Sequence, residues 1–588
     1  MANQNVKLTM KPDRFSFFWG AVLAVWLGSS ASAAGYIPPE AATGFGPVGH
    51  AEGRQAMVAA ANPLAVKAGM TMLEKGGNAV DAAVAVQMVL NLVEPQSSGI
   101  GGGAFLLHYS KDGRISAFDG REVAPAADTP ALFLDAQGRP LKFYDAVIGG
   151  RSVGVPGTLR MLEAVHRKYG KLPWATLFGP AIALCEQGFP VSPRLHALLL
   201  RDKFLPLQKK AKAYFYHADG SPLDVGEKLS NPELAGVFRE IAKGGANAFY
   251  NGKIARDIVA AVRGQEKNPG LMSEADLSGY RAVERSPVCG NYRAYRICGM
   301  PPPSSGGVAV LQILGMLSRF DMGSQPESLR TVHLISDAER LAFADRDRYL
   351  ADPDFETVPL SGLIDPGYLA LRSSLIRDDR AMEKVFPGEP PGSARLKTEG
   401  GSAMEFHSTS QISVVDRWGN AVSMTTSIED GFGSRVMVDG FLLNNELTDF
   451  SFEPEREGRP VANRVEPGKR PRSSMAPTLV LDGKGLVAVL GSPGGPFIID
   501  SVTKTLVALI DWHLDMEDAI ALPNFGSIGG PVLLERGTRL ESLKEPLEKF
   551  GQEVRIMDLN SGVHGVERIP SGWEGGADPR REGIVLGY

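Results

Sequence analysis

Cysteine and histidine are scarce in this sequence. Its 588 residues include three cysteines and nine histidines, and neither an H-E-x-x-H nor a C-x-x-C spacing occurs. Catalytic and structural zinc sites depend on such spacings, so we predict no metal and no cofactor. A chain of this length does not need disulfides to bury a core. Cys289 and Cys298 lie close enough to pair across a short loop, although their spacing alone leaves this undecided.

A dominant charge is also lacking. The 62 basic and 67 acidic residues give a formal net charge of −5, and no basic face stands out. Proteins that bind nucleic acid usually carry a basic patch, so we expect no nucleic-acid partner. The chain is long enough for several domains or for one large enzyme built from packed layers.

Long apolar runs are confined to the N-terminus. A basic stretch, residues 7–14, precedes the apolar run Phe15–Leu27, and small residues ending at Ala33 follow. This order is typical of a signal peptide, and the run is short for a membrane span. We predict a signal peptide over residues 1–33, a mature start at Ala34 and a periplasmic or secreted protein without a stable membrane anchor. The alternative is an uncleaved anchor.

A β-hairpin is predicted near residue 409. The β-branched runs Ile412–Val415 and Ala421–Thr426 flank the turn residues Gly419-Asn420. The preceding stretch, residues 386–402, is rich in glycine and proline and is a poor candidate for regular structure. An accessible loop therefore leads into a strand that opens with Thr409.

Thr409 is a candidate nucleophile. A threonine hydroxyl needs an adjacent base, and cutting the chain before the threonine supplies one, because the new α-amine lies beside the hydroxyl. The α-amine has an ordinary pKa of about 7.7–8, so part of it is unprotonated at neutral pH. The alternative is a structural threonine, which is common in strands.

Helices are predicted mainly before residue 350 and strands mainly after residue 411. A largely helical first part and a strand-rich second part favour one sandwich of helices and sheets over two independent domains. The expected elements are helices from Asn62 to Gly77 and from Asp81 to Leu92, strands at 104–109 and 114–118, a mostly helical region at 171–300, a turn at 301–307 with helix through about Leu350, and strands at 441–443, 478–481 and 486–490.

Ser152 provides a rival nucleophile. Gly150-Arg-Ser-Val-Gly154 matches the G-x-S-x-G elbow of serine hydrolases. The elbow requires a strand directly before it and a helix directly after it, whereas Pro156-Gly157 intervenes before a helix expected from Thr158. We therefore interpret the match as accidental.

Several motifs occur together in one order along the chain. They are Asp81-Ala-Ala-Val with Val93-Glu-Pro95 and a triple glycine, Arg121-Glu-Val-Ala-Pro125, Pro302-Pro-Ser-Ser-Gly-Gly307, Thr409 with Ser413-Val-Val-Asp416, Leu442-Leu-Asn-Asn445 with Asp449-Phe450, Lys469-Arg-Pro-Arg-Ser-Ser-Met475, Gly491-Ser-Pro-Gly-Gly495 and Gly576-Ala-Asp-Pro-Arg580. With these motifs the chain resembles the γ-glutamyltranspeptidase (glutathione hydrolase) family of N-terminal-nucleophile hydrolases over nearly its whole mature length.

The resemblance implies an α+β fold, the αββα sandwich of N-terminal-nucleophile hydrolases, built as one large domain from two self-cleaved subunits. The cut would separate a large subunit, residues 34–408, from a small subunit, residues 409–588. Thr409 would then carry the γ-glutamyl group of glutathione and related amides to water or to an amino acid or peptide acceptor.

The resemblance also assigns roles to individual residues. They are Thr409 as nucleophile with Ser427 as its hydroxyl partner, Gly494 and Gly495 as backbone donors to the oxyanion, Arg121, Ser473 and Ser474 for the donor's α-carboxylate, and Glu446, Asp449 and Glu429 for its α-ammonium. An arginine fork matches a carboxylate better than a lysine does.

Three positions depart from the family pattern. Ser427 replaces a threonine but keeps the hydroxyl, and Glu429 replaces an asparagine and adds a third acid. The segment Ser451–Pro460 is short for a full active-site lid and has no tyrosine. A reduced lid would admit bulkier donors and water.

Three alternatives remain beside this interpretation. A cephalosporin or glutaryl acylase on the same scaffold would act on side-chain amides without an α-amine. A serine hydrolase would use Ser152. A binding protein would use the pocket around Arg121 without catalysis.

Overall fold

The computed structural model describes residue 46 and residues 49–588, except residues 402, 404, 406 and 407. The predicted signal peptide, residues 1–33, and the predicted start of the large subunit lie outside the described residues. No helix in the described ranges is both long and apolar enough to cross a membrane.

The predicted hairpin is confirmed and lies at the centre of a sheet. Strands β10 (Ser408–Val415) and β11 (Ala421–Glu429) pair antiparallel, with Thr409 opposite Ser427. The side chain of Asp416 accepts hydrogen bonds from the backbone of the turn, and Gly419 has φ +83°, a conformation that glycine adopts without strain.

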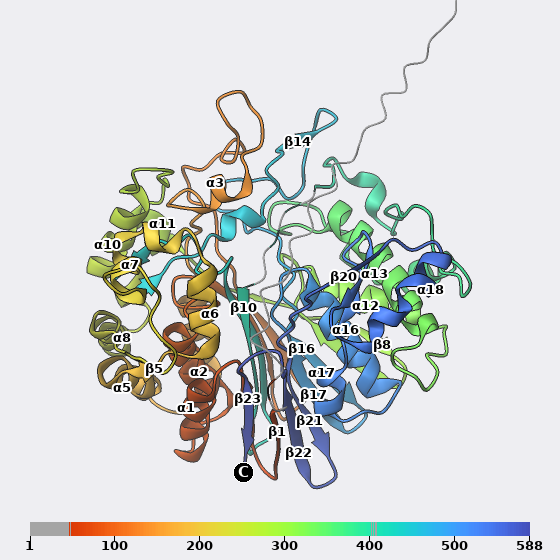
Figure 1. Ribbon diagram of the computed structural model, residues 1–588, viewed down its shortest axis with the longest axis horizontal. Helices are drawn as coiled ribbons and strands as arrows, with labels where there is room; N and C mark the ends of the chain where they lie inside the picture. Colours follow the sequence, from red (N-terminus) through yellow and green to blue (C-terminus); the bar gives the residue numbers. More distant parts are fainter. Residues whose placement is uncertain (1–45, 47–48, 402, 404, 406–407) are drawn as a thin grey trace, which may run out of the picture. The chain divides into compact units, whose positions relative to one another are not determined.

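Two seven-stranded antiparallel sheets organise the described residues (Figure 1). The first sheet has the order β23 (Ile584–Gly587), β2 (Met57–Ala60), β10, β11, β3 (Gly103–Tyr109), β4 (Ile115–Gly120) and β7 (Val283–Arg285). The second has the order β1 (Gly49–Gly53), β22 (Gly572–Ala577), β21 (His564–Ile569), β17 (Gly485–Gly491), β16 (Thr478–Asp482), β9 (Tyr295–Gly299) and β8 (Val288–Tyr292).

Side-chain alternation along the strands separates two hydrophobic cores. Ile412 and Val414 of β10 join the core beneath the first group of helices. Phe105 and Leu107 of β3 point the other way, into the core shared with the second sheet. Because neighbouring strand residues face opposite sides, the first sheet is buried on both faces.

Helices cover the outer face of each sheet. Figure 1 shows α1, α2, α5 and α8 on one side of the two sheets and α12, α13 and α16 on the other. The first group is α1 (Pro63–Glu74), α2 (Ala79–Val93), α4 (Thr158–Tyr169), α5 (Gly179–Gln187), α6 (Pro193–Arg201), α7 (Lys209–Phe215), α8 (Pro232–Gly244), α9 (Asn247–Tyr250), α10 (Gly252–Arg263) and α11 (Glu274–Gly279). The second is α12 (Gly306–Leu317), α13 (Leu329–Tyr349), α14 (Leu360–Leu363), α15 (Pro366–Ser373), α16 (Phe497–Ile510), α17 (Met516–Ala521) and α18 (Lys544–Lys549).

This helix–sheet–sheet–helix order confirms the predicted αββα sandwich. Shorter elements are α3 (Phe143–Val147), the pairs β5 (Phe189–Pro190) with β6 (Lys228–Leu229), β12 (Met437–Val438) with β13 (Phe441–Leu442) and β14 (Glu455–Arg456) with β15 (Arg459–Pro460), and the three-stranded sheet β18 (Phe525–Gly526), β19 (Val532–Glu535) and β20 (Val554–Met557).

Helix capping explains why two predicted helices begin where they do. The Asn62 side chain accepts a hydrogen bond from the backbone of α1, which has proline at its first position. Asn78 and Asp81 form a capping box at α2, whose fifteen residues are all buried, as its apolar sequence predicts.

The region 171–300 contains strands that the helical prediction missed. Its last part forms β7, β8 and β9, and the last two lie at the edge of the second sheet. Cys289 and Cys298 face each other across β8 and β9 and form a disulfide. Pairing of β9 with the distant strand β16 therefore joins this hairpin to the second sheet.

Candidate active site

Thr409 lies in a hydroxyl chain that ends at the carbonyl preceding it. The Thr409 hydroxyl donates to Ser427 Oγ over 3.2 Å, and the Ser427 hydroxyl donates to the backbone carbonyl of Ser408 over 2.9 Å. The backbone N–H of Glu429 donates to Ser427 Oγ over 2.8 Å and holds that side chain in place. The strand pairing shifts register between Ser408 and Thr409, so the bond between them lies at an irregular point of the ladder.

The pocket around Thr409 gathers nine of the ten predicted site residues. Only Gly494 is not in contact with it. The lining consists of Arg121, Glu405, Thr409, Ser427, Glu429, Glu446, Asp449, Ser473, Ser474, Met475, Gly495 and Ile498. Glu405, Met475 and Ile498 are the members that the sequence-based prediction missed.

Gly494 and Gly495 precede the N-terminus of α16, which begins at Phe497. Their φ angles are +131° and +57°, in the region that glycine adopts most readily. The N-terminal end of a helix carries partial positive charge and exposes backbone N–H groups. Gly495 and Thr409 line the same pocket, so this helix terminus presents partial positive charge to it.

Arg121 follows β4, and most of the N–H donors of its guanidinium are engaged with the protein. Its guanidinium pairs with Glu446, donates to Asp449 Oδ2 over 2.5 Å, and also donates to the backbone carbonyls of Pro471 and Arg472. These interactions occupy four of the five N–H donors of a guanidinium. The resemblance implies that Arg121 meets the donor's carboxylate, but in this chain it is already surrounded by acids.

We call Arg121, Glu122, Glu446 and Asp449 the acid-rich cluster. All four residues are buried. Burial raises the pKa of each carboxyl, and for Glu446 and Asp449 the attraction to Arg121 only partly opposes this effect. Burial alone would lower the pKa of Arg121, but Glu446 and Asp449 raise it. The cluster therefore carries more acids than cations.

Glu429 adds an acid to the same pocket. Asn445 Nδ2 donates to Glu429 Oε2 over 2.5 Å. Glu429 also has φ +77°, which is uncommon for a residue with a side chain and indicates a backbone held by its surroundings. The residue is thus fixed beside Ser427 at the end of β11.

Ser473, which precedes Ser474, is held by the Pro302–Gly307 motif. The backbone N–H of Ser305 donates to the Ser473 carbonyl over 2.7 Å, and the Ser473 N–H donates to the Pro303 carbonyl over 3.1 Å. Two motifs distant in sequence therefore meet beside the pocket, which local patterns alone do not reveal.

A second group, which we call the arginine-rich cluster, comprises Arg346, Arg472, Ser474 and Glu405. Arg346 pairs with Glu405 and donates to Ser474 Oγ over 2.8 Å. Ser474 Oγ in turn donates to Glu405 Oε2 over 2.5 Å. Arg346 lies within the long helix α13, where nothing in the sequence marks it as part of a site.

Ser152 does not lie at a nucleophile elbow. It is buried, and its hydroxyl donates to the Val147 carbonyl over 2.5 Å. The preceding element is helix α3 rather than a strand, and α4 begins only at Thr158. These observations agree with the interpretation that the sequence match is accidental.

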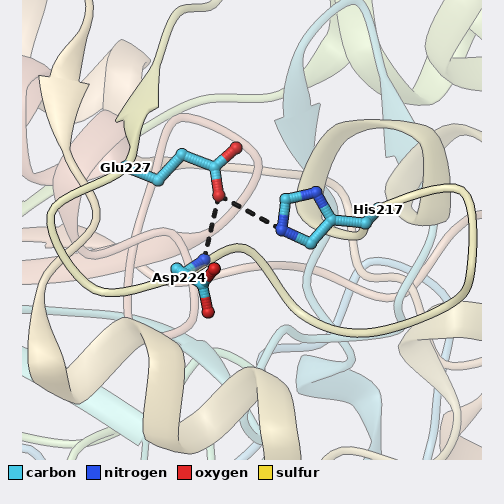
Figure 2. Close-up of side chains that lie close together, drawn as sticks. All are labelled: His217, Asp224 and Glu227. Atoms are coloured by element: carbon cyan, nitrogen blue, oxygen red, sulfur yellow. Dashed lines mark hydrogen bonds and ion pairs between the residues drawn. The ribbon is translucent and has the colours of Figure 1, made fainter.

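One group of side chains in the described ranges has spacing suited to a metal ion. It comprises His217, Asp224 and Glu227, shown in Figure 2. The Glu227 carboxylate already interacts with His217 Nε2 at 3.2 Å and accepts the backbone N–H of Asp224 at 3.0 Å. The group is partly exposed and none of its members lines the pocket, so it carries no functional assignment.

Comparison with known proteins places this geometry in a family. The family model described as gamma-glutamyltranspeptidase matches residues 65–588. A glutathione hydrolase proenzyme of Bacillus subtilis (strain 168) is 41% identical over 480 residues, 80% of each chain. The corresponding proenzyme of Escherichia coli (strain K12) is 36% identical over 595 residues, 97% of this chain and 99% of the relative.

A solved structure shares the fold over nearly the same length. The cephalosporin acylase of Bacillus halodurans superposes with a TM-score of 0.80 and 26% identity, covering 95% of this chain and 98% of that one. The match over most of the chain, together with relatives above 30% identity, shows the family. This chain belongs to the γ-glutamyltranspeptidase family.

Proposed function

We propose that this protein is a glutathione hydrolase and γ-glutamyltransferase that activates itself by cutting its chain between Ser408 and Thr409. The observation that carries the proposal is the hydroxyl chain from Thr409 through Ser427 to the Ser408 carbonyl. It lies in a pocket with both acidic and basic side chains, as a zwitterionic head group requires.

Self-cleavage would begin with attack of Thr409 Oγ on the Ser408 carbonyl carbon. The peptide C–N bond breaks as the ester bond forms, and the proton of the hydroxyl passes to the Thr409 nitrogen. Ser427 donates to the carbonyl oxygen on which negative charge develops. One such donor is typically worth roughly 3–4 kcal/mol of transition-state stabilisation. Water then hydrolyses the ester and leaves a Ser408 carboxylate and a free Thr409 amine.

Turnover would reuse the same hydroxyl. The free α-amine takes the Thr409 proton, Oγ attacks the γ-carbonyl of the donor, and the amine of the leaving group departs with a proton. The backbone N–H groups of Gly494 and Gly495 would stabilise the oxyanion. Water yields glutamate, and an acceptor amine yields a new γ-glutamyl amide.

The two proposed subunits, residues 34–408 and 409–588, would stay together after the cut. Each sheet contains strands from both sides of Thr409; for example, β2 and β3 flank β10 and β11. Separating the subunits would break both sheets and both cores. We also propose that the precursor is exported to the periplasm or secreted after removal of residues 1–33.

A side-chain acylase is the alternative, supported by the structural similarity to the cephalosporin acylase. The acid-rich cluster together with Glu429 favours a donor with an α-ammonium, because Glu446, Asp449 and Glu429 offer carboxyl groups to that ammonium, and a glutaryl donor has no ammonium to pair with them.

Mass spectrometry of the intact protein, with matched activity assays, tests the proposal. Wild type should appear as two fragments split before Thr409, whereas Thr409→Ala should remain whole and inactive. Ser152→Ala is the control and should be cut and active like wild type. The processed enzyme should hydrolyse a γ-glutamyl anilide faster than a glutaryl anilide. An uncut wild-type chain, or an active Thr409→Ala chain, would contradict the mechanism.

A further inference from the structure

Arg581 reaches the candidate nucleophile from the C-terminal part of the chain. Its Nη1 donates to the backbone carbonyl of Thr409 over 3.2 Å, and its Nε donates to the backbone carbonyl of Ser561 over 2.9 Å. Arg581 is only 5% exposed, so water screens its positive charge poorly. A buried cation is therefore attached to the residue that is expected to carry out the chemistry.

The beginning of β10 has a place for such a side chain. Strand β2 pairs with β10 only from Ile412 to Val415, which leaves the first residues of β10 without a strand on that side. The segment before β23 lies at this end of β2, because a side-chain carbon added at Gly583 would come within 3.0 Å of the Ala60 carbonyl. Arg581 lies in this segment and gives the Thr409 carbonyl a hydrogen-bond donor.

Gly562 makes room for the Arg581 side chain. A carbon added at Gly562 would lie 2.7 Å from Arg581 Cδ and 2.5 Å from Pro493 Cγ. Pro493 directly precedes Gly494 and Gly495, the expected donors to the oxyanion. Close packing against Gly562 therefore fixes the guanidinium between the nucleophile and the glycine pair.

The acids of the pocket oppose the proposed chemistry. The α-amine that cleavage sets free at Thr409 must be unprotonated in order to accept the hydroxyl proton. Nearby negative charge favours the protonated form of an amine. The charged residues that line the pocket with Thr409 are four acids and one arginine, namely Glu405, Glu429, Glu446, Asp449 and Arg121. Acids that suit the ammonium of a donor thus also favour an ammonium on the enzyme.

Arg581 supplies positive charge on the other side of Thr409. Three bonds join the carbonyl oxygen of a residue to its own nitrogen, so the Arg581 Nη1 lies within roughly 7 Å of the Thr409 nitrogen. At this range a buried cation lowers the pKa of an amine, because it disfavours the protonated form. Arg121 is less able to do so, since Glu446 and Asp449 pair with it.

Other titratable groups near Arg581 do not take over this effect. Burial lowers the pKa of His564 to about 4, so its ring is neutral in the range where an α-amine titrates. Charged groups on the neighbouring segments pair among themselves, Asp578 with Arg580 and Glu94 with Arg194.

We propose that Arg581 is a positioning residue for Thr409, which fixes the backbone of the nucleophile and, after cleavage, keeps its new α-amine in the unprotonated form that acts as the base. The inference rests on the proposed function and explains how a base can work beside so many acids. It also assigns a role to a residue directly after the Gly576–Arg580 motif.

The first test measures kcat against pH for a saturating γ-glutamyl anilide and processed enzyme. At saturation the donor's ammonium occupies the acids, so the acid limb of kcat reports the α-amine. Arg581→Met should move this limb to higher pH and lower kcat at about pH 6 roughly 3- to 10-fold relative to its own plateau. Arg581→Lys keeps the charge and should keep the wild-type limb.

Arg568→Met is the matched control for the first test. Arg568 pairs with Asp482 and does not line the pocket, so its loss should leave the profile unchanged. A purely structural role of Arg581 would lower kcat at every pH without moving the limb. A limb that stays in place in Arg581→Met, or that moves equally in Arg581→Lys, would overturn the proposal.

The second test needs no variant and decides alone if the Arg581→Met chain is not cut. Competitive labelling of processed wild type with acetic anhydride gives the pKa of the Thr409 α-amine, read by mass spectrometry from the first peptide of the small subunit. Despite the acids, this pKa should not exceed the ordinary value of about 7.7–8, and a higher value would overturn the proposal. An uncut wild type would refute the proposed function as a whole, whereas a cut and active wild type that fails these tests would refute this inference alone.

Discussion

The two charged clusters beside Thr409 use the same residue types in opposite proportions. In the acid-rich cluster, one arginine faces three buried carboxyl groups, and in the arginine-rich cluster, two arginines share one buried acid. Both are buried, so water cannot screen the imbalance as it does at a surface. The difference teaches that two neighbouring buried clusters of the same residue types can carry opposite charge imbalances, and we expect the acid-rich one to suit the cationic end of a zwitterionic donor.

Removing an acid from the acid-rich cluster should have the largest effect. Asp449→Ala leaves Arg121 short of a partner and removes charge from the ammonium site. Losing one partner of a buried, hydrogen-bonded charge pair at a binding site typically costs about 2–5 kcal/mol, so kcat/KM for a γ-glutamyl anilide should fall roughly 30- to 4000-fold.

Steady-state kinetics on processed enzyme, with thermal unfolding alongside, measures this effect. Asp354→Ala is a suitable control, because Asp354 also pairs with arginines but is 47% exposed and lies outside the pocket lining. Glutaryl anilide hydrolysis should suffer less than γ-glutamyl hydrolysis. An equal loss on both substrates would mean that Asp449 supports the fold rather than the ammonium.

Changing the shape of the Arg121 cation should have the next largest effect. Lysine keeps the charge but cannot reach Glu446, Asp449 and two carbonyls from a fork. Arg121→Lys should therefore raise KM about 10- to 100-fold for the γ-glutamyl anilide through misplaced acids. A 4-aminobutyryl anilide should show a similar rise if Arg121 positions the ammonium site, and no rise if it binds the carboxylate directly.

The acid-rich cluster is easier to predict from the sequence than the arginine-rich cluster. Turn chemistry and β-branched runs locate β10 and β11, and capping residues locate α1 and α2, because these signals are local. The members of the acid-rich cluster lie in motifs that the family resemblance marks. Arg346 and Glu405 carry no local signal, since one lies in a long helix and the other in an irregular segment. Likewise, β9 pairs with a distant strand, β16, and β8 pairs with β9, so this hairpin depends on a contact that is remote in the sequence.

Lowering the pH should weaken donor binding, and the effect should come from the acid-rich cluster alone. Burial raises the pKa of Glu446 and Asp449, and binding of an ammonium favours their ionised forms. As pH falls through these raised pKa values, protons neutralise the carboxylates that would hold the ammonium, so KM for the γ-glutamyl anilide should rise as the pH is lowered. The KM of a glutaryl anilide should not follow, and parallel profiles would assign the change to another group.

The smallest effect should come from removing the Ser473 hydroxyl, and the comparison with Ser474 tests whether both serines contribute to donor binding. Ser473 lines the pocket and its hydroxyl accepts the Met475 N–H over 3.1 Å, but no hydrogen bond joins that hydroxyl to Arg346 or Glu405, unlike the hydroxyl of Ser474. One neutral hydrogen bond is worth about 1 kcal/mol, so Ser473→Ala should raise KM about fivefold. Ser474→Ala should raise it further, because it also removes one hydrogen bond from Arg346 and one from Glu405. If the two substitutions raised KM equally, the donor's α-carboxylate would lie between the two serines rather than nearer the arginine-rich cluster.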